Sequence, residues 1–181
     1  NEVTIGANGF AMQNQGTFTH SSGLVNITFT GSTTVLNNSD SFYDLEIDTD
    51  TNGAYYPVNT IVANNLTVSS GTFAASGLGD APKNYTLTVI GDVVVSGTLC
   101  RTDTAFDNTF GSLTINFGGT YTATSGTTHI TGESADGNAF SNSGTFTHND
   151  GTINISTQTA TWCLTGNVVG GNVFYNLITG T

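Results

Sequence analysis

Basic residues are almost absent from this sequence. Lys83 and Arg101 stand against 13 acidic residues, which gives a formal net charge of −11. A surface with so little positive charge repels the phosphates of nucleic acids and of anionic lipids. No apolar run reaches the roughly 18 residues that a membrane-spanning helix needs. We therefore expect neither a nucleic-acid partner nor membrane insertion.

Cysteine is also scarce, with only Cys100 and Cys163 in the chain. The two residues fall at different phases of the repeat described below and more than two repeat units apart. Such a separation exceeds the roughly 7 Å between Cα atoms that a disulfide can span. We expect that they do not pair with each other and that both are mostly buried.

Strong helix formers are rare, since Lys, Arg and Met together supply three residues. Thr, Val, Ile, Phe and Tyr, which suit a pleated strand, are abundant instead, and Gly, Asn and Ser supply turns. This composition predicts an all-β protein. Residue 1 is Asn and no signal peptide is present, so we expect residues 1–181 to be one continuous domain that is a segment or subunit of a larger assembly.

A long internal repeat is the strongest feature of the sequence. Residues 11–28 match residues 139–156 without a gap, at an offset of 128 (139 − 11). Phe42-Tyr43-Asp44-Leu45 recurs later as Phe174-Tyr175-Asn176-Leu177. Shorter Gly-Thr-aromatic or Gly-Thr-Leu echoes lie between the copies, and five steps over the offset of 128 average about 26 residues (128/5). These echoes begin at Gly16, Gly71, Gly97, Gly119 and Gly144.

This period predicts a parallel β-helix, or β-solenoid, with coils of about 22–27 residues. Phe18, Phe73, Tyr121 and Phe146 would form one inward ladder, each with the preceding glycine at a corner where positive φ costs least. A second inward ladder would contain Leu66, Leu87 and Leu113, each within an alternating polar–apolar segment. The alternative fold is a β-sandwich with strand donation between subunits.

The repeated phrase resembles repeats of large bacterial surface β-helix (adhesin-like) proteins and of structural proteins of tailed phages. The resemblance covers mainly residues 11–47 and 139–179. It implies a right-handed parallel β-helix with a structural or adhesive role, and it transfers no catalytic residue.

A weak calcium candidate lies at Asp48, Asp50 and Asn52, which place oxygen ligands at positions 1, 3 and 5 of an EF-hand-like loop with Gly53 at position 6. Asn59 stands at the twelfth position, where the motif needs a bidentate acid. A polar turn after a strand over 42–47 is the favoured interpretation. No other cofactor is expected.

Other chemistry-bearing residues favour structural interpretations. His20 and His148 share a repeat phase but lie about five coils apart, and His129 has a different phase, so we expect no metal site. Asp103 with Asp107 and Arg101, or Glu133 with Asp136, could mark a polysaccharide hydrolase or lyase. Both groups lack the second basic group that this chemistry requires, so we expect no enzyme.

Five Asn-x-Ser/Thr sequons would be glycosylation acceptors if the source organism modifies secreted proteins, although several are expected by chance in such a composition. They begin at Asn26, Asn37, Asn65, Asn84 and Asn154.

The predicted function is that of a structural component of an extracellular, cell-surface or virion surface, where a rigid solenoid serves in spacing, decoration or display. Its partners would be other copies or other subunits of that assembly, because strand-like segments at 1–5 and 174–179 have no caps. The alternative is a glycan- or receptor-binding module that uses Tyr55, Tyr56 and Trp162 as stacking platforms. A polysaccharide hydrolase or lyase is the third candidate.

Overall fold

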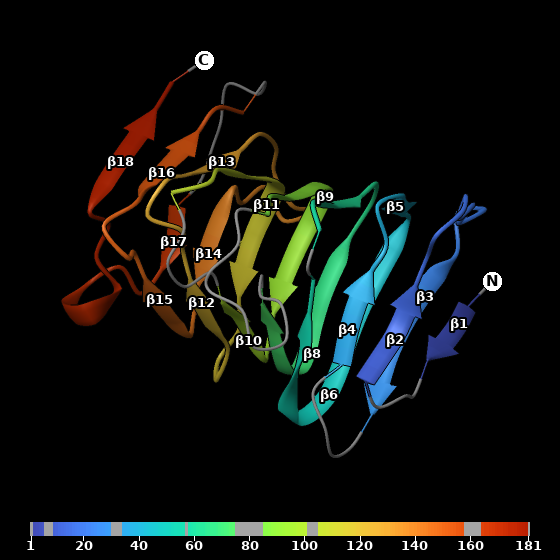
Figure 1. Ribbon diagram of the computed structural model, residues 1–181. Helices are drawn as coiled ribbons and strands as arrows, with labels where there is room; N and C mark the ends of the chain where they lie inside the picture. The colour runs from blue at the N-terminus through green and yellow to red at the C-terminus, as the bar shows by residue number, and fades with distance from the viewer. Residues whose placement is uncertain are drawn as a thin grey trace.

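The computed structural model describes residues 2–5, 9–29, 34–56, 58–74, 85–100, 105–157 and 164–180. Within these ranges the chain is all-β, and the one helical element is a short 3-10 turn, η1 (Gly170–Asn172). Parallel strands stack into a β-solenoid with its two termini at opposite ends of the stack (Figure 1). The predicted solenoid is therefore confirmed, and the β-sandwich alternative is not.

Three faces, here called A, B and C, make up each coil, and the chain passes through them in that order. On face A each segment pairs in parallel with the next. Its members are β1 (Glu2–Ile5), β3 (Leu24–Phe29), the first part of β6 (Asp44–Tyr55), the first part of β8 (Leu66–Ala74), the last part of β9 (Leu87–Val95), the last part of β11 (Asn108–Ile115), β14 (Phe140–Asn142) and β17 (Leu164–Gly166).

Faces B and C are parallel ladders of the same kind. Face B contains β2 (Gly9–Gln13), β4 (Thr34–Asn37), the last parts of β6 and β8, β10 (Thr98–Cys100), β12 (Thr120–Thr122) and β15 (Thr145–Thr147). Face C contains β5 (Ser41–Phe42), β7 (Thr60–Val62), the first parts of β9 and β11, β13 (Thr127–Ile130), β16 (Thr152–Ile155) and β18 (Asn176–Thr179).

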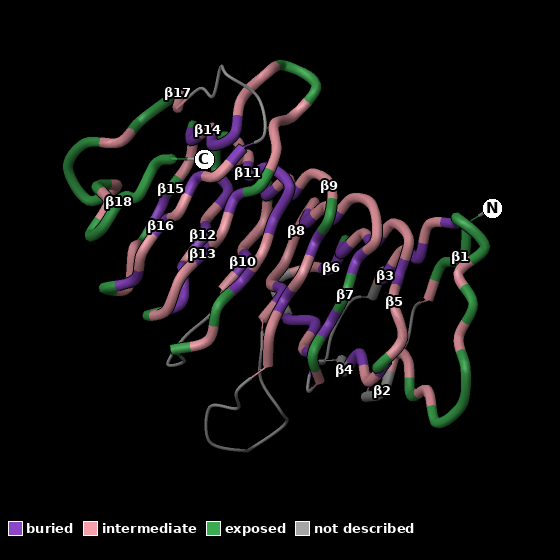
Figure 2. Tube along the Cα trace, turned by 90° about the horizontal axis from the view of Figure 1, so that it is seen from above, coloured by how far each residue is buried: buried purple, intermediate pink, exposed green. Residues whose placement is uncertain are grey.

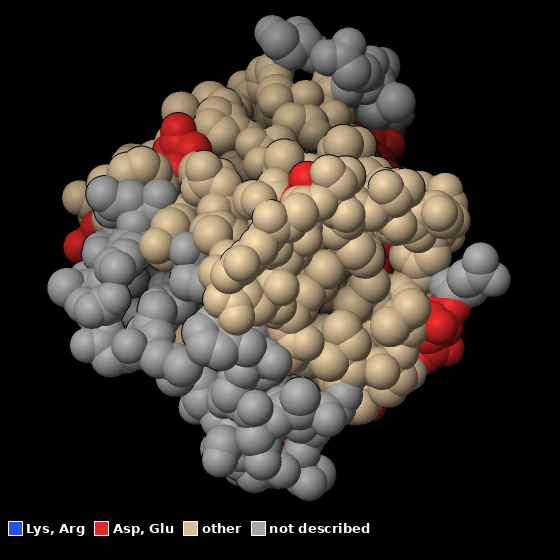
Figure 3. Space-filling model, turned by 45° about the vertical axis from the view of Figure 1, so that its right-hand side comes forward, with Lys and Arg blue, Asp and Glu red and all other residues tan. Residues whose placement is uncertain are grey.

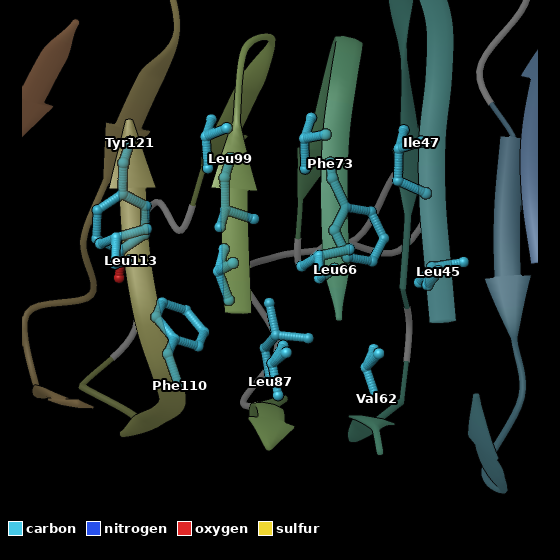
Figure 4. Packing of buried hydrophobic residues seen from close by; sticks show 14 of the residues in the cluster. Leu45, Ile47, Val62, Leu66, Phe73, Leu87, Leu99, Phe110, Leu113 and Tyr121 are labelled. Atoms are coloured by element: carbon cyan, nitrogen blue, oxygen red, sulfur yellow. The ribbon is translucent and has the colours of Figure 1, made fainter. Parts of the chain in front are cut away.

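The interior is one hydrophobic column enclosed by the three faces. Along each strand the side chains alternate, so that in β8 Leu66, Val68 and Phe73 are fully buried while Thr67 is only partly so. Side chains from all three faces meet in the middle of the stack (Figure 4). Buried residues recur in the coils between the two ends, whereas the described residues of the last coil, 164–180, are intermediate or exposed (Figure 2). Burying each such side chain contributes about 1.5–3 kcal/mol.

The predicted aromatic ladder is confirmed on face B for three of its four members, Phe73, Tyr121 and Phe146. Phe73, Leu99, Tyr121 and Phe146 occupy equivalent positions on successive strands and are fully buried. The rings of Tyr121 and Phe146 stack with centroids 6.0 Å apart and an interplanar angle of 18°.

Phe18 does not belong to that ladder, contrary to the prediction. Its ring packs against Phe42 of β5 on face C, with 5.8 Å between the centroids. Leu87 is likewise on face C, where it pairs with Thr60, whereas Leu66 and Leu113 lie on face A. Alternating polar and apolar residues indicate a strand with one buried side. Strands on all three faces have this alternation, so it cannot tell on which face a given strand lies.

The glycines of the ladder do stack in register, but positive φ is not what most of them share. Only Gly71 has a positive φ, of 67°, and Gly119 and Gly144 do not. A Cβ on Gly119 would lie 2.2 Å from the carbonyl oxygen of Val95 in the preceding coil, and one on Gly144 would lie 2.3 Å from that of Gly119. Close contact between stacked coils therefore explains these two glycines.

Coil length varies more than predicted. Paired residues are separated by as few as 19 positions (Gly53 to Thr72, 72 − 53) and by as many as 27 (Leu66 to Val93, 93 − 66). β6 bends from face A to face B with register shifts near Asp48, which shortens this coil. The predicted polar turn after a strand over 42–47 is therefore wrong, because β6 continues to Tyr55.

The two copies of the long repeat have the same local structure. The amide of Gly16 donates to Oδ1 of Asn14, and the amide of Gly144 donates to Oδ1 of Asn142, both at 3.0 Å. Each copy then makes a turn in which the glycine amide donates to a histidine carbonyl at 2.9 Å, at Gly23 and at Gly151. The two residues between have positive φ in both turns, as in a type I′ turn.

The copies nevertheless lie on different faces. The strand after the turn is β3 on face A in the first copy and β16 on face C in the second. The offset of the repeat therefore corresponds to a non-integral number of coils, and the assumption of five whole coils is wrong. The second copy is the first one rotated by one face about the solenoid axis.

Candidate functional site

Acidic side chains fasten neighbouring coils to one another. Asp44 Oδ1 accepts hydrogen bonds from the Asn64 side chain at 2.8 Å and from the Asn65 amide at 3.0 Å. Asp92 Oδ1 accepts from Ser112 Oγ at 2.7 Å. Further acids accept from neutral donors about one coil away in the same manner: Asp40, Glu46, Asp48 and Asp107.

Sequence analysis missed this role, although each of these acids lies about one coil before or after a Ser, Thr or Asn. Hydrogen bonds to charged groups contribute roughly 1.5–3 kcal/mol each where they are shielded, and less where solvent reaches them. In Figure 3 the acidic groups form separate patches rather than one cluster. The negative charge therefore supports the stack along its sides.

A shallow groove runs along the corner between faces A and B. It is lined by residues of four successive coils: Thr49, Asp50, Ser70, Gly71, Thr72, Gly97, Thr98 and Gly118. The groove exists because glycines occupy the corner position in successive coils and leave no side chain to fill it. Beside Gly118 stands Phe117, which is 91% exposed.

The calcium candidate lies at one end of this groove. Asp48 is exposed and accepts a hydrogen bond from Ser70 Oγ at 2.8 Å, and Asp50 lines the groove. These residues and Asn52 fall within β6, so the backbone is extended there rather than looped. The side chain of Asn52 lies outside the described residues. Among the described residues, no three His, Cys, Asp or Glu side chains are grouped as a metal site. Calcium binding stays a prediction.

The histidines make local contacts. His20 Nδ1 accepts from the Ser22 amide at 3.1 Å, and His148 Nδ1 accepts from the Asp150 amide at 2.9 Å. The ring of His20 lies 5.5 Å from that of Tyr43. His20 and His148 do not share one side of the solenoid as expected, because their copies lie on different faces.

The ring of His148 lies 5.5 Å from that of Tyr175, which repeats the contact of the first copy. His129 contacts face C neighbours instead, with Nε2 3.7 Å from Asp107 Oδ2 and Nδ1 3.4 Å from Asn154 Nδ2.

The aromatic platforms proposed from the sequence are only partly available. Tyr56 is fully buried, with its ring 4.7 Å from that of Phe73, so its assignment as an exposed platform is wrong. Tyr55 is half-buried, and Trp162 lies outside the described residues. The aromatic side chain that sequence analysis missed is Phe117, in a turn that offers no pattern to distinguish it from a core residue.

The remaining candidates are dispersed. Arg101, Asp103 and Cys163 lie outside the described residues, and Cys100 is half-buried at the end of β10. Glu133 and Asp136 lie in the loop between β13 and β14.

Four of the five sequons fall in the described part of the chain. Asn26, Asn37, Asn65 and Asn154 are half-buried, in or beside strands, and Asn84 lies outside the described ranges. Asn65 Oδ1 accepts the amide of Asp92 at 2.9 Å. Use of these sequons stays a prediction.

Comparison with known protein families, with curated proteins and with solved structures gave no match. Over the described residues, no helix is long and apolar enough to cross a bilayer.

Proposed function

We propose that this protein is a structural component of an extracellular, cell-surface or virion surface, in which the solenoid acts as a rigid spacer that carries or displays other parts. The observation that carries the proposal is the continuous interior column of stacked side chains between two ends that lie far apart in the chain and in space (Figures 1 and 4). Close-packed interiors have low compressibility, so such a column holds its ends at a fixed distance.

The fastening of the coils supports the same role. Backbone pairing within the three ladders is reinforced outside by acids and by Ser, Thr and Asn donors of the next coil. The acidic sides disfavour contact between neighbouring rods and any partnership with nucleic acid. The partners in this proposal are other copies or other subunits of a surface assembly.

The distance between the two ends tests the spacer role. With donor and acceptor dyes attached at the two termini, single-molecule energy transfer should give one narrow distribution of the end-to-end distance. Phe146→Ala, which removes a ring from the interior column, should broaden it or unfold the chain, whereas Thr147→Ala on the exposed side of the same strand should not. A broad distribution for the unaltered protein would refute a rigid spacer.

A glycan-binding role is the second candidate, and Phe117 is the observation that favours it. An exposed aromatic ring beside a groove with Thr72, Thr98 and Asp50 offers a stacking platform together with hydroxyl and carboxylate groups. Phe117→Ala should abolish retention on a glycan array, with Ile90→Ala, also an exposed apolar residue on a side, as the control. Equal retention of both variants would exclude this groove.

A further inference from the structure

The outer side of face B carries threonines in a regular arrangement. The strands β8, β10, β12 and β15 pair in register at one threonine each: Thr72, Thr98, Thr120 and Thr145. β12 and β15 carry a second threonine two residues further on, and these two, Thr122 and Thr147, pair in the same register. Side chains alternate along a strand, so all six point away from the interior. These six residues are here called the threonine array.

The outer columns of the other two faces are mixed in composition. On face A the paired outer positions of five successive strands hold Glu46, Thr67, Val94, Thr114 and Ser141. On face C they hold Ile61, Thr88, Thr109, His129 and Asn154. The strand propensity of threonine acts on all three faces alike, so it does not account for one residue type repeated over four strands of face B.

The threonine array is uncharged, and the rest of the fold does not use its hydroxyls. The described face B residues from β8 to β15 include no acid and no base. On face A the hydroxyl of Ser112 is held by Asp92, whereas among the described residues no such hydrogen bond engages a hydroxyl of the array. Thr72 and Thr98 also line the groove at the corner of faces A and B. These hydroxyls are therefore available to a ligand outside the solenoid.

The interior fixes the positions of the array. Beneath it lie four fully buried side chains, the first three of which are labelled in Figure 4: Phe73, Leu99, Tyr121 and Phe146. The rings of Tyr121 and Phe146 stack with centroids 6.0 Å apart, directly below the part of the array with two columns. Threonine is branched at Cβ and has few rotamers on a strand. A ligand therefore meets hydroxyl and methyl groups whose ordering cost is already met by folding.

The spacing of the array is close to that of a crystalline water lattice. Paired residues on neighbouring strands are about 4.8 Å apart, and residues two apart on one strand are separated by about 6.7 Å. Each oxygen of ice hydrogen-bonds to four others at about 2.75 Å, so oxygens that share a neighbour lie about 4.5 Å apart and the layers repeat at about 7.4 Å. Over the three steps from Thr72 to Thr145 the difference amounts to about 1 Å, which rotating hydroxyls can accommodate.

We propose that the threonine array is an ice-binding face, with the surface of an ice crystal as its ligand. One hydrogen bond between a hydroxyl and water contributes only about 0.5–1.5 kcal/mol, so a single threonine cannot select ice. Six such contacts in a fixed arrangement add together only on a ligand that repeats with the same spacing, as crystalline water does and liquid water does not. This activity goes beyond the spacer role and does not depend on it.

Partition into growing ice tests the proposal. When a dilute solution freezes slowly on a cold surface, solutes that do not bind ice stay in the liquid, whereas the unaltered protein should be enriched in the ice. Thr120→Tyr and Thr147→Lys should lower the ratio of protein in ice to protein in liquid by at least about tenfold, because a longer side chain holds the ice surface away from the neighbouring hydroxyls. Thr109→Tyr, on the outer side of face C, should partition like the unaltered protein.

Circular dichroism and the unfolding midpoints of the three variants separate lost binding from lost fold. Thr147 is exposed, so Thr147→Lys should keep the midpoint of the unaltered protein. Exclusion of the unaltered protein from ice would overturn the proposal, and so would equal partition of Thr109→Tyr and the two array variants. Retention on crystalline cellulose without enrichment in ice would also overturn it, by assigning the array to a solid polysaccharide. The end-to-end distance judges the spacer role separately, so either proposal can fail without the other.

Discussion

The hydroxyl of Tyr121 lies 2.8 Å from Thr128 Oγ1 inside the solenoid, where it connects β12 on face B with β13 on face C. Both side chains are buried, with exposed fractions of 0% and 1%. A polar group in an apolar interior is tolerated when it is hydrogen-bonded, and this pair ties two faces of one coil together.

Removal of both partners of this pair should destabilise the protein by less than the sum of the two single removals. Tyr121→Phe leaves the Thr128 hydroxyl without its phenolic partner, and we expect a loss of about 1–2 kcal/mol in the free energy of unfolding. Thr128→Val should cost a similar amount, and the double variant should cost less than the sum. Denaturant unfolding of the four proteins measures the coupling, and strict additivity would show that the contact contributes nothing.

Two adjacent glycines should respond to alanine for different reasons. Gly119→Ala places a Cβ 2.2 Å from the Val95 carbonyl oxygen, so the stack must open, and we expect a loss of more than about 3 kcal/mol. A Cβ added to Gly118 would meet nothing within 4 Å, but the φ of this residue is +85°. Gly118→Ala should therefore cost about 1–2 kcal/mol, through backbone strain alone. Equal losses in thermal or denaturant unfolding would contradict the close-contact explanation.

The two repeat copies should tolerate exchange of their acceptor residues. The Phe18 amide donates to Asp40 Oδ2 and the Phe146 amide donates to Asn172 Oδ1, each at 2.6 Å. Asn172→Asp keeps an acceptor oxygen in place, so we expect a change within about 0.5 kcal/mol. Asn172→Ala removes the acceptor and should cost about 1 kcal/mol. If the Asp variant is destabilised as strongly as the Ala variant, the two copies are not equivalent at this position.

Calcium should have little effect on stability. An extended β6 directs Asp48 and Asp50 outward without wrapping the chain around an ion, so we expect the unfolding midpoint to be the same with added calcium and with chelator. A midpoint that rises with calcium, and loses that rise in Asp50→Asn, would instead establish the site at the end of the groove.

The sequence by itself determined the class of fold and the contents of one ladder. A strand with branched or aromatic side chains at alternate positions buries only one of its two sides. The recurring Gly-Thr-aromatic phrase predicted that Phe73, Tyr121 and Phe146 occupy equivalent positions on stacked strands. The repeat also marks two segments with the same local structure, since each turn begins at a histidine and ends at a glycine, although the residues between are Ser21 and Ser22 in one copy and Asn149 and Asp150 in the other.

The tertiary structure alone decided which face each segment occupies. Coils contain different numbers of residues at their corners, so phase along the chain does not convert into angle around the axis, and Phe18 and Leu87 fall on face C. Burial likewise depends on which coil lies above: Leu45 and Leu177 both follow a Phe-Tyr pair, yet Leu45, which pairs with Leu66 of the next coil, is 1% exposed and Leu177 is 40% exposed. The sequence holds the acids and their donors, but which donor meets which acid depends on the register that only the stacked fold sets.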